Sequence, residues 1–112
     1  MNTPHHDDEL QESSTNFDME NVRPFLQRIS PLIESGFGPE QIEQVCRLAE
    51  RMKHDDEQEL EFPIRYGGRD ALMRVGIFMD DINSPDVCIL APPMLAEQID
   101  VEIENFFDEL GT

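Results

Sequence analysis

Features that would place a protein in or across a membrane are missing from this sequence of 112 residues. It contains no run of about 18 apolar residues, so no segment qualifies as a transmembrane helix. Residues 1–20 hold neither a basic residue nor an apolar block, so we expect no secretory signal peptide there. We therefore expect a cytoplasmic protein with no membrane partner.

Cysteine is scarce, and the motifs of common enzymes are missing. Cys46 and Cys88 belong to different predicted elements, and neither has the Cys-x-x-Cys spacing of a zinc or redox site. We expect both to be reduced, buried thiols. The sequence has no phosphate loop, no nucleophile elbow and no H-E-x-x-H motif. These absences predict a protein that is not an enzyme and that uses no cofactor.

One short motif does suggest metal chemistry. The tetrapeptide His-Asp-Asp-Glu occurs at residues 6–9 and again at residues 54–57. Imidazole and carboxylate groups together can bind divalent metals. One copy falls in a predicted tail and the other in a loop or a helix end, where no supporting shell is expected. We predict no metal site.

Basic residues are in short supply, and their distribution is uneven. The chain has 8 Lys and Arg against 25 Asp and Glu, which gives a formal net charge of −17. All the bases lie within residues 22–74, whereas residues 1–21 and 75–112 contain acids and no base. Such a surface repels phosphates, so we expect no direct binding to nucleic acid. A basic protein surface is the favoured partner, and solubility alone is the alternative.

The apolar pattern predicts a single α+β domain over residues 19–112, preceded by a disordered acidic tail over residues 1–18. Apolar spacings of three and four predict two N-terminal helices, over residues 20–35 and from 39 to about 53. Pro31 should kink or split the first helix. The helices should cover one face of a sheet.

Three strands are predicted after these helices. Apolar residues alternate over residues 60–66, and Gly67-Gly68 forms a hairpin turn to a strand over residues 71–79. The wholly apolar residues 87–91 form the third strand. Because the connections are short, we expect a three-stranded antiparallel meander.

Two residues carry positional information within these strands. Pro63 cannot donate a hydrogen bond to a neighbouring strand, so it marks the first strand as an edge. Gly76 lies inside the second strand, where it predicts either a bulge or a close approach of other atoms. Three arginines surround the hairpin, and we expect them to pair with acids of the last helix or of residues 55–61: Arg65, Arg69 and Arg74. The alternative is a small anion site at the hairpin, where Gly67 and Gly68 give close access to the backbone.

The last predicted helix begins at Pro92-Pro93, ends near Leu110 and is amphipathic and acidic. One stripe is apolar and faces the core: Leu95, Ile99, Ile103, Phe106 and Leu110. Four carboxylates lie on another face within an arc of about 80°, in a row about 16 Å long: Glu97, Asp100, Glu104 and Asp108. No base nearby in the sequence is available to pair with these acids or with Glu102 and Glu109. The charges of this helix are therefore set by something outside it.

Three interpretations of the acidic row remain open. It can bind a basic protein, with Met94 and Val101 as apolar anchors beside the charges. It can mimic the phosphates of a nucleic acid. It can also be a plain solvated face.

The function that we expect is that of a small acidic, non-enzymatic protein which binds a basic protein as an inhibitor, an immunity or antitoxin-like protein, or a chaperone. One alternative is a nucleic-acid mimic that inhibits a DNA- or RNA-binding protein. Another is a self-associating structural subunit, a homodimer formed through residues 87–91 if that strand lies at an edge. The predicted partner-binding residues are Glu97, Asp100, Glu104, Asp108, Val101 and Met94.

Overall fold

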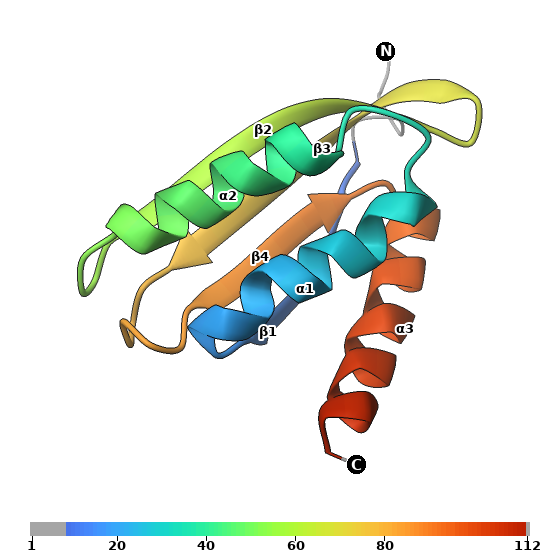
Figure 1. The fold of residues 1–112 in the computed structure, drawn as a ribbon. Helices are drawn as coiled ribbons and strands as arrows, with labels where there is room; N and C mark the ends of the chain where they lie inside the picture. The colour runs from blue at the N-terminus through green and yellow to red at the C-terminus, as the bar shows by residue number, and fades with distance from the viewer. Residues whose placement is uncertain (1–8, 112) are drawn as a thin grey trace.

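The computed structural model describes residues 9–111, which form an α+β domain (Figure 1). A strand comes first, followed by two helices, three strands and a last helix. A single 3-10 turn, η2 (Ser30–Leu32), separates the first two helices. In chain order the other elements are β1 (Gln11–Asn16), α1 (Met19–Ile29), α2 (Pro39–Arg51), β2 (Glu57–Tyr66), β3 (Arg69–Phe78), β4 (Asp86–Ala91) and α3 (Pro93–Leu110).

The sheet has four antiparallel strands in the order β1-β4-β3-β2. The predicted meander is present as β2, β3 and β4, with Gly67 and Gly68 at positive φ in the hairpin turn. The prediction of only three strands is wrong, because β1 precedes both helices and pairs with β4. The disordered tail predicted over residues 1–18 includes residues 11–16, which form β1, while residues 1–8 lie outside the described part of the chain.

The side chains of β1 do not explain its folding, since its sequence is polar throughout. Its register runs from Gln11 opposite Ala91 to Asn16 opposite Asp86, so backbone groups of β4 find their partners in β1. Only Ser13 is buried, and its hydroxyl donates a hydrogen bond of 3.0 Å to the carbonyl oxygen of Ala96. Backbone pairing with a distant strand therefore outweighs the local polarity.

This strand order places β4 in the interior of the sheet, between β1 and β3. A central position explains why Val87, Ile89 and Ala91 are buried. It also removes the condition on which a homodimer through residues 87–91 depended, because the edges are β1 and β2. The edge position that Pro63 predicted for β2 is confirmed.

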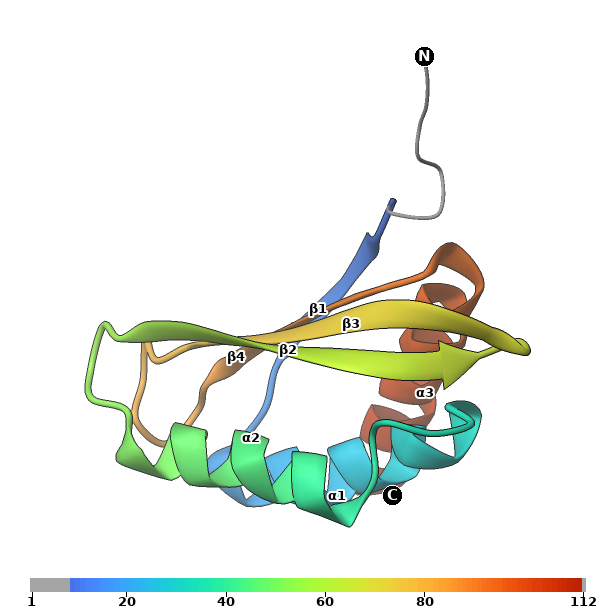
Figure 2. The same cartoon turned by 90° about the horizontal axis from the view of Figure 1, so that it is seen from above.

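The break predicted at Pro31 is also confirmed, because α1 ends at Ile29 and η2 follows. All three helices lie on one side of the sheet (Figure 2). Every second strand residue points toward them and fills the core, including Phe62, Ile64, Met73, Val75, Ile77, Val87, Ile89 and Ala91. Within residues 9–111, no helix covers the opposite side, which we call the open face.

No helix in residues 9–111 combines the length and the apolar composition that crossing a membrane requires. Both cysteines are free, with Cys46 buried in α2 and Cys88 half-buried in β4. Burial raises the pKa of the Cys46 thiol, and burial with the nearby Glu12 carboxylate raises the pKa of Cys88 to about 11. Both groups are therefore protonated at neutral pH.

Candidate protein-binding surface on the C-terminal helix

The inner side of α3 anchors it to the rest of the domain. Leu95, Ala96, Ile99 and Phe106 are buried, while Ile103 is partly buried against the core. Leu110, which we expected in the same apolar stripe, is 50% exposed. The reason is that the last turn of α3 projects past the sheet (Figure 1). The helix is therefore amphipathic, as predicted, over most of its length.

The other side of α3 carries the predicted acidic row. Glu97, Asp100, Glu104 and Asp108 are all exposed. None of them forms an ion pair or a hydrogen bond with another residue of the described chain. Met94 and Val101 are 70% and 54% exposed and lie on the same side of the helix. We call these six residues the outer face of α3.

The two flanking acids of α3 behave differently from the row. Arg28 of α1 donates from Nε to Glu102 Oε1 at 2.7 Å, and from Nη1 and Nη2 to the two carboxylate oxygens of Glu109 at 2.8 and 2.5 Å. No base that is near these two acids in the sequence pairs with them, but α1 packs beside α3 and brings the distant Arg28 to them. The acids of α3 thus divide into two groups. Glu102 and Glu109 bind Arg28, whereas the row pairs with no cation of the described part of the chain.

Removing the contacts of Arg28 should raise the pKa of Glu109. The hydrogen bonds from Arg28 hold the pKa of Glu109 below its ordinary value of 4.5. A lowered folded-state pKa gives stability that is present above pH 4.5 and is lost as the pH falls through the folded-state value. In Arg28→Gln we expect the pKa of Glu109 to rise toward 4.5, measured by NMR titration of the side-chain carboxyl carbon.

A matched variant controls for general effects of charge. Arg47 pairs with Glu43 at 2.9 Å on α2, so Arg47→Gln removes the same charge from a different contact. The pKa of Glu109 should be unchanged in that variant. An unchanged pKa in Arg28→Gln would show that the two groups do not interact in solution.

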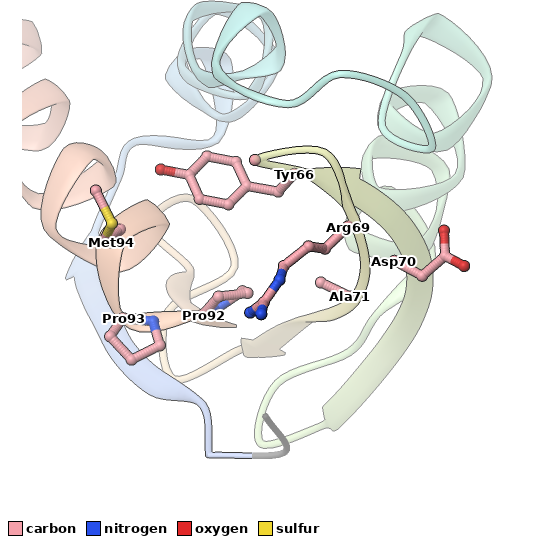
Figure 3. Close-up of a pocket in the computed structure, with 8 residues that line it drawn as sticks. Tyr66, Arg69, Asp70, Ala71, Pro92, Pro93 and Met94 are labelled. Carbon is pink, nitrogen blue, oxygen red and sulfur yellow. The ribbon is translucent and has the colours of Figure 1, made fainter. Parts of the chain in front are cut away.

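A groove of about 660 Å³ adjoins the outer face of α3, between the β2–β3 hairpin and the beginning of the helix. In Figure 3, Tyr66 and Met94 face each other across it, and Arg69 projects toward Pro92. The Tyr66 hydroxyl donates a hydrogen bond of 2.7 Å to Gln98 Oε1 on α3. Burial and the charge of Glu97 raise the pKa of Tyr66, so this hydroxyl stays protonated. The groove is lined by Tyr66, Gly67, Arg69, Asp70, Ala71, Pro92, Pro93 and Met94.

The groove exists because the hairpin is longer than β4. The last pair between β3 and β4 is Arg74 opposite Leu90, whereas β3 begins at Arg69. After Ala91, Pro92 and Pro93 turn the chain into α3, which leaves the end of the hairpin without a neighbouring strand. We did not predict this groove, and its signal in the sequence is the short third strand followed directly by Pro-Pro.

Two of the three hairpin arginines form ion pairs, and only Arg74 does so with an acid of residues 55–61, as expected. Arg74 contacts Glu61 at 3.0 Å, and Arg65 contacts Asp70 at 3.1 Å and Glu34 at 3.9 Å. Arg69 has no ion pair with any residue from 9 to 111, and it is exposed in the groove. The groove thus offers apolar walls with one cation.

The second His-Asp-Asp-Glu segment contributes to a small acidic cluster. Single ligand atoms of His54, Asp55 and Asp80 lie within 4.8 Å of one another, and all three residues are exposed. Residues 6–8 of the first copy fall outside the described chain. The exposed cluster has no further feature that points to an ion, and we assign it no function.

Comparisons of the chain with protein-family models, with curated proteins and with solved structures found no match. The proposals below therefore depend on the chemistry of its own residues.

Proposed function

We propose that this is a non-enzymatic, acidic binding protein that holds a basic protein on the outer face of α3. The observation that carries the proposal is a row of exposed carboxylates that pair with no cation of residues 9–111: Glu97, Asp100, Glu104 and Asp108. The same helix contains two other acids that Arg28 neutralises. Lysines or arginines of a partner would neutralise the row, as Arg28 neutralises Glu102 and Glu109.

The apolar residues of the outer face support a protein as the partner. Met94 lies one turn before the acidic row, and Val101 lies within it. Apolar and charged groups therefore alternate along one side of α3. An apolar centre with a polar rim is typical of protein interfaces. The groove begins at Met94 and provides room for an apolar side chain of the partner next to the charged contacts. The partner should therefore combine basic and apolar residues.

The test compares the wild-type chain with a variant in which the row is neutralised: E97Q, D100N, E104Q and D108N. Each tagged protein is used to capture partners from a lysate of its source organism at two salt concentrations, and mass spectrometry identifies them. For the basic partner recovered with the wild type, we expect affinity to fall at least about 10-fold in the variant, because charge complementarity is lost. Raising the salt should weaken wild-type binding in the same direction.

A second variant with the same change in net charge provides the control: D18N, E20Q, E40Q and E50Q. These exposed acids lie at the beginning of α1 and on α2, away from the outer face of α3. Affinity in this control should stay near the wild-type value. Wild-type affinity in the α3 variant would disprove the proposal. Recovery of the protein alone, with a dimer in light scattering, would favour a self-associating subunit.

A further inference from the structure

The open face of the sheet has a surface of its own, separate from α3. Figure 2 shows this side of the sheet, which no helix of residues 9–111 covers. The strand register arranges the side chains on it in rows that cross the four strands. From β1 to β2, the first row is Asn16, Asp86, Phe78 and Glu57; the second is Ser14, Cys88, Gly76 and Glu59; the third is Glu12, Leu90, Arg74 and Glu61.

Charge on this face is not balanced. In the third row, Arg74 contacts Glu61 at 3.0 Å, so that base is already neutralised. The first and second rows contain no base. None of their three carboxylates, which belong to Glu57, Glu59 and Asp86, forms an ion pair within the described chain. Asp86 accepts one hydrogen bond, from Asn16 Nδ2 at 2.9 Å. These carboxylates leave the first two rows negative.

A depression of about 390 Å³ lies among these carboxylates. Its floor is Gly76, because glycine places no side chain on the face at that position. Phe78, which is 36% exposed, and Cys88 give it apolar walls. Glu57, Glu59 and Asp86 stand around it. The depression therefore combines a flat apolar surface with several hydrogen-bond acceptors.

The fold itself does not require glycine at this position. A glycine inside a strand destabilises the strand relative to alanine. Gly76 does not have a positive φ, and a Cβ added there would come no closer than 3.7 Å to any neighbouring atom. The ladder is regular on both sides, with Gly76 opposite Glu59 and Cys88, so the bulge that its position suggested is absent. Gly76 predicted either a bulge or the close approach of other atoms, and because no bulge is present, the second interpretation remains.

We infer that the depression over Gly76 is a docking site for an arginine side chain of a basic protein partner. A guanidinium group has five donors in a planar fork, which suit several surrounding carboxylates. Its flat face also stacks on aromatic rings, and Phe78 offers one at the wall. The Cys88 thiol is neutral at physiological pH and adds no competing charge. This site adds a second contact surface to the proposed function and does not depend on the outer face of α3.

The test uses the full chain labelled with ¹⁵N and two small probes in NMR titrations. The first probe is acetyl-arginine N-methylamide, and the second is acetyl-citrulline N-methylamide, its uncharged analogue. We expect the arginine probe to shift the amides around Gly76, Phe78, Glu59 and Cys88, with a Kd on the order of 1 mM, an affinity fitting a probe that makes few contacts. The citrulline probe should leave them unchanged.

Two variants separate shape from charge. Gly76→Val fills the depression without changing any charge, and its β-branched side chain suits a strand. It should raise the Kd of the arginine probe at least 10-fold. Removing two carboxylates, in the double variant Glu57→Gln and Glu59→Gln, should raise it about 10-fold. The double variant Glu97→Gln and Asp100→Asn, on α3, should have no effect.

Several results would overturn the inference. Shifts spread over all acidic surfaces, or an unchanged Kd in Gly76→Val, would show that arginine is attracted only by net charge. Shifts around Gly76 produced by calcium but not by arginine would assign the depression to a cation. A concentration-dependent dimer that Gly76→Val abolishes would assign it to a second copy of the chain. Because the α3 variants and Gly76→Val change separate surfaces, either proposal can fail without the other.

Discussion

Replacing Phe17 with alanine is expected to lower the free energy of unfolding by about 3–5 kcal/mol, the usual cost of removing a buried phenylalanine ring. Phe17 follows β1, and only 1% of its surface is exposed. Its ring centroid lies 4.7 Å from that of Phe25, 5.8 Å from Phe106 and 5.4 Å from Phe107. One side chain thus joins the end of β1 to α1 and α3. Urea denaturation followed by circular dichroism measures the change.

The size of this effect follows from where Phe17 lies. Small domains have a total stability of about 5–15 kcal/mol, so this loss is a large fraction of the whole. The backbone NH of Phe17 also donates a hydrogen bond of 3.0 Å to the carbonyl oxygen of Pro85, which continues the contact between β1 and the loop before β4. Hydrogen exchange in Phe17→Ala should therefore accelerate first at the amides of β1 and of the last turns of α3.

Phe107 provides the matched control. It belongs to the same aromatic cluster and stacks on Phe17 with an interplanar angle of 12°, but it is 38% exposed. Phe107→Ala should therefore cost less than half as much as Phe17→Ala, because less apolar surface leaves water when Phe107 packs. Equal stability losses in the two variants would mean that residues 11–17 do not pack against the helices in solution as they do in this structure.

The second large effect is expected at Gly36, in the turn before α2. Its φ is +98°, and a Cβ there would come 2.3 Å from the carbonyl oxygen of Pro63 and 2.8 Å from the Cα of Ile64. Both atoms belong to the backbone of β2, so they cannot turn aside as a flexible side chain could. Gly36→Ala should lower the free energy of unfolding by more than about 2 kcal/mol, from backbone strain and from displacement of β2.

Displacing the turn also uncovers an edge of the sheet. The NH of Glu34 donates to the carbonyl oxygen of Arg65, and the NH of Arg65 donates to the carbonyl oxygen of Ser35, both at 2.9 Å. These bonds cover part of the outer edge of β2, and exposed strand edges promote association between chains. We expect Gly36→Ala to denature at a lower urea concentration and to form larger species in light scattering after mild heating.

Gly76→Ala is the control for this variant. A Cβ at Gly76 meets nothing closer than 3.7 Å, so alanine should leave stability unchanged or raise it slightly. The two variants thus make the same chemical change and should differ in outcome because of their surroundings. A Gly36→Ala protein as stable as the wild type would show that the turn and β2 separate easily.

The two proposed surfaces share one electrostatic setting. With a formal net charge of −17, the whole chain attracts a basic partner over a distance limited by the ionic strength. This attraction accelerates encounters but does not select a binding site. Selection would come from local shape, which is the alternation of Met94 and Val101 with acids on α3 and the depression over Gly76 on the sheet.

The sequence by itself determined the elements whose signals lie within a few neighbouring residues. The helices, the break at Pro31, the hairpin at Gly67-Gly68 and the exposed acidic row of α3 all follow from periodicity and from the conformational limits of proline and glycine. The α+β class followed from the order of these elements. Each of these features depends on a residue and its near neighbours, so it can be read from the chain directly.

Only the tertiary structure decided the features that join distant residues. The strand β1 has a polar sequence, and it forms because residues 11–16 meet the backbone of β4, 70 to 80 positions later in the chain. Arg28 neutralises Glu102 and Glu109 across separations of 74 and 81 residues, which divides the acids of α3 into two groups. The depression over Gly76 exists because the register brings Glu57, Glu59, Asp86 and Phe78 around it. Backbone pairing and ion pairing depend on distance in space, and no local pattern in the sequence records which distant groups will meet.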